Sequence, residues 1–169
     1  MRKLTPIEKA QRYVEKAKQV LQENGEYDSE LKAYQNQKAV RTAGRSLWNA
    51  VEVMVNAVFN VRNEQCPNPF VKDYVRAVAQ HDRRLSTLVE ASYDTLWSGM
   101  GDLGLQGKPI CDAGFRIAND IIKTCIKMLP KQPNNASLHS RRAKLLSLHP
   151  TPLLSPLPPK PVSAEILKS

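Results

Sequence analysis

The stretch KAVRTAGRSLWNAVEVMVNAVFNVRN, residues 38–63, decides the fold, because two adjacent faces of it are apolar when it is wound as a helix. Its apolar and small residues recur at steps of three and four positions along two neighbouring stripes: Ala43, Leu47, Ala50, Met54, Ala57 and Val61 in one, and Gly44, Trp48, Val51, Val55 and Val58 in the other. This periodicity predicts a central helix over residues 37–62 that several other helices contact. Its polar edge, from Arg41 to Asn63, shows no convergent chemistry in the sequence.

Weaker, single apolar stripes predict the other helices. Thr5, Pro6 and Glu8 have the spacing of a capping box with proline at the first helical position, so a helix is expected to begin there and to end near Gly25. Residues 26–37 are polar and predict at most an early helical turn.

The second half of the chain predicts three more helical segments. A short helix is expected over residues 70–80, and Asp82 is expected to cap a longer helix whose apolar stripe continues to Met100. Residues 99–107 hold four of the seven glycines and predict a loop, after which Pro109 begins the last helix.

The composition changes after Pro130. Residues 131–169 contain seven of the twelve prolines and no Phe, Trp or Tyr, which is typical of a disordered tail. We therefore predict an all-α protein: an up-and-down four- to five-helix bundle over residues 1–130, followed by a disordered C-terminal tail over residues 131–169.

The positive charge is concentrated in that tail. The net charge is +9, but residues 1–130 hold 19 Lys and Arg against 15 Asp and Glu, whereas residues 131–169 hold 6 against 1. The predicted bundle is only mildly basic, so net charge alone is a weak argument for nucleic-acid binding.

The three cysteines, Cys66, Cys111 and Cys125, are an odd number without the spacing of a disulfide framework, and they predict buried reduced thiols. The N-terminus lacks the apolar core of a signal peptide, and no apolar run approaches membrane-spanning length. A cytoplasmic location without membrane contact is expected.

The sequence GMGDLG, residues 99–104, matches the glycine pattern of dinucleotide-binding loops. Those glycines act between a strand and a helix, where backbone amides meet a pyrophosphate. Here a helical segment precedes them, so a flexible connector is predicted and no cofactor is expected. Glu90 and Asp94 lack a second acidic cluster, and His139 and His149 lie in the tail, so no metal site is expected either.

Arg76 and His81 are the only residue pair with a catalytic interpretation. An arginine that neutralises a phosphate and a histidine that transfers a proton near neutral pH would suit RNA cleavage. Five positions apart on one straight helix they point about 140° from each other, so they converge only if the helix breaks near Gln80. Chance spacing is the alternative.

Basic residues near that junction, Lys72, Arg83 and Arg84, predict a possible RNA-binding patch, although no aromatic platform accompanies them in the sequence. A solvated helix face is the alternative.

The segments KAVRTAGRSLWN, residues 38–49, and ASYDTLWSGMG, residues 91–101, resemble a family of small bacterial all-helical proteins known only as a domain of unknown function. More loosely they are similar to HEPN domains (higher eukaryotes and prokaryotes nucleotide-binding domains). The resemblance implies a helical bundle and, from the HEPN class, dimerisation and association with toxin–antitoxin or defence systems. Only Arg76 and His81 could inherit a catalytic role from it, and Ala77 stands where active members carry a polar residue.

Two functions follow as hypotheses. The first is a non-catalytic interaction module, with self-association as a homodimer or binding of a protein partner, because the packing stripes are strong and catalytic groups are few. The second is an HEPN-like RNA-binding protein or ribonuclease that uses Arg76 and His81.

Overall fold

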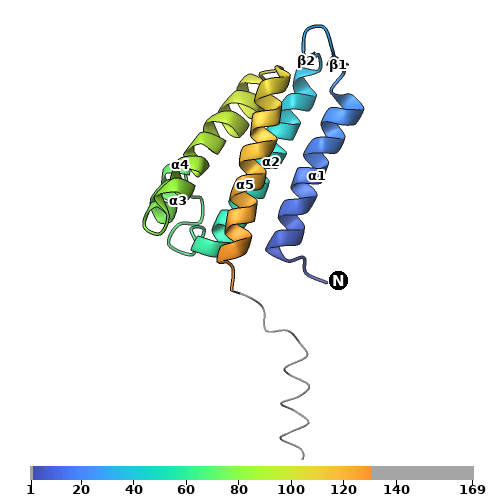
Figure 1. Ribbon diagram of the computed structural model, residues 1–169. Coiled ribbons are helices and arrows are strands. Elements are labelled where there is room, and N and C mark those ends of the chain that lie inside the picture. The colour runs from blue at the N-terminus through green and yellow to red at the C-terminus, as the bar shows by residue number, and fades with distance from the viewer. Residues whose placement is uncertain (1, 131–169) are drawn as a thin grey trace, which may run out of the picture. The chain divides into compact units, whose positions relative to one another are not determined.

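The computed structural model of the protein describes residues 2–130. Helices α1 (Pro6–Asn24), α2 (Gln37–Phe59), α4 (Arg83–Ser92) and α5 (Lys108–Met128) run side by side along one axis, and α4 continues directly into the π-helix η1 (Tyr93–Leu103) (Figure 1). The short helix α3 (Val71–Ala79) packs beside α4. The predicted all-α, up-and-down bundle is confirmed, and the predicted disordered tail, residues 131–169, lies outside the described residues.

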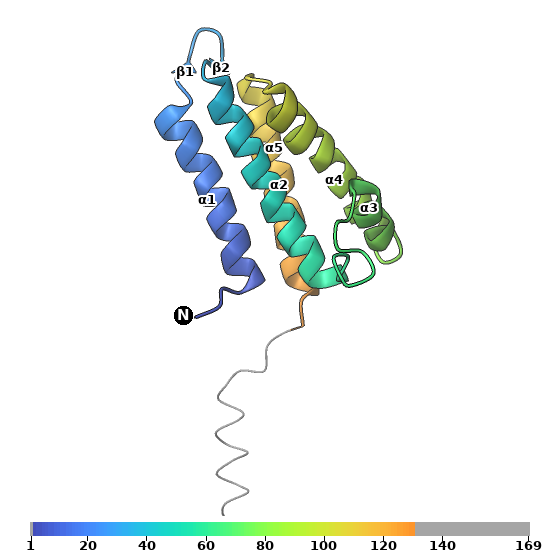
Figure 2. The same cartoon turned by 180° about the vertical axis from the view of Figure 1, so that it is seen from behind.

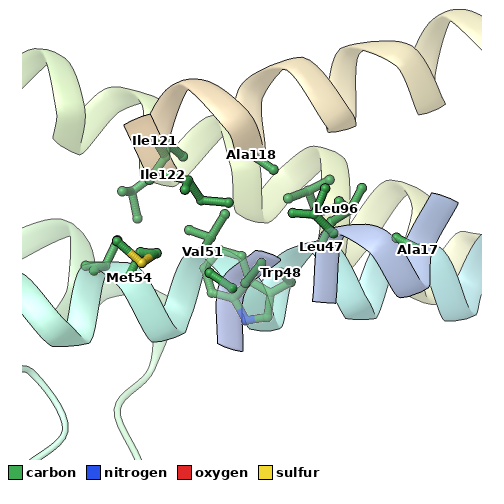
Figure 3. Packing of buried hydrophobic residues seen from close by; sticks show 14 of the residues in the cluster. Ala17, Leu47, Trp48, Val51, Met54, Leu96, Ala118, Ile121 and Ile122 are labelled. Atoms are coloured by element: carbon green, nitrogen blue, oxygen red, sulfur yellow. The ribbon is translucent and has the colours of Figure 1, made fainter. Parts of the chain in front are cut away.

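Helix α2 is the central element of the bundle. It contacts α1, η1, α5 and α3, and seen from behind, α1 and α4 lie on opposite sides of it (Figure 2). Figure 3 shows its side chains in one cluster with those of α5 and η1. Both predicted stripes are buried over most of their length: Ala43, Leu47, Ala50 and Met54 in the first, and Gly44, Trp48, Val51 and Val55 in the second. Outside the two stripes, Ala39, Val40 and Ser46 are also buried.

The predicted end of this helix at Arg62 is wrong. Helix α2 ends at Phe59, because Asn60 adopts a left-handed conformation with φ of 49° and turns the chain back. The Asn56 side chain then accepts a hydrogen bond of 2.6 Å from the backbone N–H of Arg62, which holds the turn in place.

The predicted helix starts are confirmed by their caps. Thr5 Oγ1 accepts from the backbone N–H of Glu8 at 3.2 Å, and the Glu8 carboxylate accepts from the N–H of Thr5 at 2.8 Å, which completes the capping box. Asp82 accepts from the N–H of Leu85 at 2.9 Å and so begins α4.

Residues 26–37 do not form the expected helical turn. They form a small antiparallel hairpin of β1 (Tyr27–Asp28) and β2 (Ala33–Tyr34), in which Tyr27 pairs with Tyr34. The hairpin is bonded to the start of α5 and the loop before it, because the backbone N–H of Tyr34 donates to Gln106 O at 2.9 Å and that of Lys108 donates to Lys32 O at 2.9 Å. The pattern of residues 26–37 does not predict these hydrogen bonds, because their partners lie more than 70 residues away along the chain.

The predicted flexible loop over residues 99–107 is also wrong at its start. The π-helix η1 includes Gly99 and Gly101 and ends at Leu103, so only residues 104–107 connect it to α5. The reason is close packing: a Cβ on Gly44 of α2 would lie 2.5 Å from Met100 Cβ and 2.6 Å from Leu96 O. The glycines therefore let η1 pack directly against α2.

Candidate functional site

The helical structure is interrupted between α3 and α4, since α3 ends at Ala79 and Asp82 caps α4. This is the place where the Arg76–His81 hypothesis requires an interruption. His81 is exposed, with Nδ1 3.2 Å from Ala77 O and its ring 5.4 Å from that of Phe59. Arg76 is exposed on α3, and within residues 2–130 no hydrogen bond or ion pair joins the two side chains. Their joint catalytic role stays a prediction.

The predicted basic residues occupy different surroundings. Lys72 places Nζ 5.8 Å from the centre of the Phe70 ring. Arg84 lines a shallow groove between α4 and α5 together with Lys123 and Lys127, and Arg83 is exposed in the first turn of α4. An RNA-binding role for Lys72, Arg83 and Arg84 also stays a prediction.

The polar edge of α2, for which no convergent chemistry was expected, borders two concave surfaces. Asn49 and Glu52 line both of them. We call the first the aromatic groove, lined by Trp48, Asn49, Glu52, Pro69, Phe70, Val71, Tyr93 and Trp97. We call the second the polar pocket, lined by Tyr13, Asn49, Glu52, Val53, Asn56, Arg62 and Tyr74.

The aromatic groove is built where the start of α3 faces η1. Tyr93 and Trp97 are stacked, with ring centres 6.5 Å apart and planes 12° apart, and Trp48 meets Tyr93 edge-on at 5.3 Å. Arg45 lies over the Trp97 ring at 5.9 Å and forms an ion pair of 3.6 Å with Asp102. Tyr93 and Trp97 belong to the π-helix, a form often found at functional sites.

Phe70 stands at the edge of this groove with 71% of its surface exposed. It immediately precedes α3, and its backbone N–H donates to Asp73 at 2.9 Å, which fixes the start of the helix. An ordered, exposed aromatic ring beside Tyr93 and Trp97 is a surface suited to binding.

The polar pocket is formed by three separate segments that meet over α2. Tyr13 comes from α1, Tyr74 from α3 and Arg62 from the turn that Asn60 makes after α2. Tyr74 is 2% exposed, and its ring also contacts the Trp48 ring edge-on at 6.3 Å. Tyr74 therefore lines the polar pocket and packs against Trp48, which lines the aromatic groove.

Burial dominates the electrostatics of the polar pocket. It raises the pKa of the Glu52 carboxyl above its usual value, although the positive charge of Arg62 and hydrogen bonding from Trp48 and Tyr74 act in the opposite direction. Burial, together with the nearby Glu52 charge, raises the pKa of Tyr74 to about 12. The Tyr74 hydroxyl thus stays a hydrogen-bond donor at neutral pH.

Sequence reasoning missed this site because its partners come from other helices. The available signal was the spacing of Asn49, Glu52 and Asn56 at three and four positions on a helix that is otherwise largely apolar. Such a polar stripe opposite two adjacent apolar ones indicates either a solvated edge or a polar pocket, and only the positions of α1 and α3 distinguish them.

Within residues 2–130, no group of three or more His, Cys, Asp and Glu side chains is arranged to hold a metal ion. Cys111 and Cys125 are buried free thiols, and burial raises their pKa to about 11 and about 12 respectively, whereas Cys66 is partly exposed. None of the helices in this part of the chain is both long and apolar enough to cross a membrane.

The fold and these surfaces define a small helical-bundle protein with an aromatic groove and a polar pocket beside its central helix. A family model described as "Domain of unknown function (DUF5618)" matches residues 5–127, and the chain belongs to this family. The predicted resemblance to a bacterial all-helical family of unknown function is confirmed, whereas the looser similarity to HEPN domains stays a prediction.

A solved structure supports the fold. The chain is similar to a protein of unknown function from Dyadobacter fermentans, with a TM-score of 0.66 and 24% identity over 74% of this chain and 96% of that chain. At this level of identity the similarity shows the fold alone. A comparison with the curated proteins finds no match.

Proposed function

We propose that the protein is a non-catalytic interaction module that binds a proline-rich segment of a partner protein in the aromatic groove. The exposed Phe70 ring beside the half-buried Tyr93 and Trp97 is the observation that carries this proposal. Exposed aromatic side chains of this kind are enriched at interfaces, because they bury a large area with little loss of conformational entropy.

The arrangement of the rings favours a proline-rich ligand. Polyproline II segments dock in grooves lined by aromatic rings, and their backbone is already extended before binding. The stacked pair of Tyr93 and Trp97 and the perpendicular Trp48 present ring surfaces in two orientations. Proline rings can pack between surfaces of that kind.

The charges indicate which residue should accompany the prolines. Glu52 is the one acidic side chain among the residues that line the groove, and Arg45, which lies over the Trp97 ring, is already paired with Asp102. A lysine or arginine next to the prolines would compensate the half-buried carboxylate of Glu52, while an acidic residue would be repelled.

The test uses the full chain and three synthetic peptides: deca-proline, the same peptide with one central lysine, and the same peptide with one central glutamate. Trp48 and Trp97 are the only two tryptophans in the chain, so tryptophan fluorescence reports directly on the groove. The lysine peptide should bind most tightly, and Phe70→Ala or Trp97→Ala should weaken it about tenfold.

The matched control is Leu31→Ala, which removes an exposed apolar side chain from the hairpin, outside the groove. Glu52→Gln should abolish the preference for lysine over glutamate and leave deca-proline binding in place. If a single-stranded oligouridine changes the fluorescence and the three peptides do not, the groove binds nucleic acid and the proposal is wrong.

The ribonuclease hypothesis is the second candidate, favoured by the break between α3 and α4 at Gln80 that leaves His81 exposed. Purified protein and His81→Ala should be incubated with mixed RNA under the same conditions. Cleavage that disappears in His81→Ala would support Arg76 and His81 as the site. Equal cleavage by both proteins, or none by either, would reject it.

Self-association also has a specific observation in its favour. Tyr27, Leu31, Leu103 and Leu105 are all exposed. The hairpin is joined to the loop that follows η1, because the backbone N–H of Tyr34 donates to Gln106 O at 2.9 Å. A second copy that covers these side chains would give a concentration-dependent mass in sedimentation. A strict monomer over a wide concentration range would exclude it.

A further inference from the structure

We infer that the polar pocket is a binding site for a small zwitterion, of the class of an α-amino acid with a short side chain. The inference goes beyond the proposed function, because Arg62 and Tyr13 line the polar pocket and do not line the aromatic groove, whereas Asn49 and Glu52 line both.

Two opposite charges border this pocket without forming an ion pair. The Glu52 carboxylate comes from α2 and the Arg62 guanidinium from the following turn, and the Arg62 charge acts on the Glu52 carboxyl. Yet the ion pairs within 4.0 Å in residues 2–130 do not include Glu52 with Arg62. A ligand with an ammonium and a carboxylate group could contact both charges at once.

The neutral groups suit the same ligand. Asn49 and Asn56 carry side-chain amides, which both donate and accept. The Tyr74 hydroxyl lies beside Glu52 as its hydrogen-bond partner. The Asn56 oxygen already accepts from the N–H of Arg62, so its two N–H donors remain for an anionic group. Val53 is the one aliphatic side chain of the lining, which leaves little apolar surface for a long side chain.

The size of the pocket limits the ligand. Its volume is about 160 Å³, whereas pockets for drug-sized ligands begin at about 300 Å³. Glycine, alanine or serine is therefore a better match than an aromatic amino acid.

The position of Arg62 is fixed by the backbone. The left-handed Asn60 reverses the chain after α2, and the hydrogen bond from Arg62 N–H to Asn56 anchors the residue next to the pocket. The backbone of Arg62 is thus held beside the pocket, and its side chain lines the pocket together with Glu52 without an ion pair between the two.

The test is isothermal titration calorimetry of the full chain with glycine, L-alanine and L-leucine, and with methylamine and acetate as the two halves of the ligand. Glycine and alanine should bind, and methylamine, acetate and leucine should each bind at least about tenfold more weakly. Equal binding of acetate or methylamine would overturn the zwitterion assignment, as would the absence of any heat with glycine and alanine at millimolar concentration.

Variants locate the site. Arg62→Gln and Glu52→Gln should each weaken alanine binding about tenfold or more, because each removes one charged partner. Arg116→Gln, which neutralises an exposed arginine on α5, is the matched control and should change nothing. Phe70→Ala should also leave alanine binding intact, so a failure here is distinguishable from a failure of the aromatic groove. Unchanged affinity in Arg62→Gln would reject the inference.

Discussion

The aromatic groove and the polar pocket share Asn49 and Glu52, yet they differ in chemistry. The start of α3 and the π-helix supply rings to the groove, while α1, the middle of α3 and the turn after α2 supply hydroxyl and guanidinium groups to the pocket. The same two side chains therefore serve an aromatic environment on one side and a polar one on the other. The chemistry of a helix edge is set by the elements that neighbour it as much as by its own residues.

Tyr74 should give the largest effect, because it lines the polar pocket, packs against Trp48 and is nearly fully buried. Tyr74→Ala leaves a cavity beside Trp48 and should lower the free energy of unfolding by about 3–5 kcal/mol. Tyr74→Phe retains the ring and should lower it by about 1 kcal/mol through loss of the hydroxyl hydrogen bond. Urea denaturation followed by circular dichroism measures both.

Tyr74→Phe also distinguishes the two surfaces in binding experiments. Tyr74→Phe should weaken alanine binding in the polar pocket and leave the lysine peptide in the groove unaffected. Equal stability of the two variants would show that the Tyr74 ring does not support the core as its burial indicates.

Gly44 tests how far the groove depends on the approach of η1 to α2. Gly44→Ala should destabilise the protein by about 1–3 kcal/mol, because the added Cβ meets Met100 Cβ at 2.5 Å, Leu96 O at 2.6 Å and Gly101 N at 2.8 Å. Displacement of η1 should also make Trp97 more accessible to acrylamide quenching.

Gly114→Ala is the matched substitution on α5. The two nearest neighbours of its added Cβ would be Leu96 Cδ2 at 2.8 Å and Met100 Sδ at 2.9 Å, which lie toward the ends of flexible side chains, and Thr95 Cγ2 follows at 3.8 Å. The gain in helix propensity of about 1 kcal/mol should offset that crowding. If both variants lose the same stability, crowding against backbone atoms is not what distinguishes Gly44.

Asn60 tests the polar pocket alone. Asn60→Ala keeps a Cβ on a residue with φ of 49° but removes the short polar side chain that helps asparagine tolerate this conformation, so a loss of about 1 kcal/mol is expected. Asn60→Gly should be close to neutral. Alanine binding should weaken in Asn60→Ala, since Arg62 follows this turn, while the peptide binding of the groove stays unchanged.

The core of this fold was predictable because apolar stripes and helix caps can be recognised in the sequence itself. The stripes through Leu47 and Trp48 predicted the central helix, and the local chemistry of Thr5, Glu8 and Asp82 predicted the helix starts. Caps and amphipathic stripes depend on residues close together in the chain, so a single sequence is sufficient for them.

The wrong or missing predictions concern features that depend on contacts between residues far apart in the chain. The glycines of residues 99–104 indicated a loop, but Gly99 and Gly101 lie within η1, and Gly101 packs against Gly44 and Arg45 of α2, more than fifty residues away along the chain. The polar pocket was likewise hidden, because Glu52 acquires its environment from Tyr13 and Tyr74. Periodicity shows which face of a helix is polar, and it does not show what that face contacts.

The smallest expected effect concerns the ionisation of Glu52, the residue that both surfaces share. Burial raises the pKa of its carboxyl in the folded protein above the usual value of 4.5, so the folded state holds this proton more tightly than the unfolded state. The stabilisation from this group is complete below pH 4.5 and is lost as the pH rises through the folded pKa. Above the folded pKa this loss of stability no longer changes with pH.

Glu52→Gln removes this ionisation. The variant should therefore gain stability relative to the native protein as the pH rises from below 4.5 toward neutrality, and the difference should then level off. Urea denaturation at a series of pH values measures it, with Glu90→Gln on the exposed face of α4 as the matched removal of one negative charge. The same pH dependence in both variants would mean that burial between the groove and the pocket does not control Glu52. A bound cation beside the carboxylate should reduce the difference at neutral pH, so repeating the series with the lysine peptide links the stability of Glu52 to the ligand proposed for the groove.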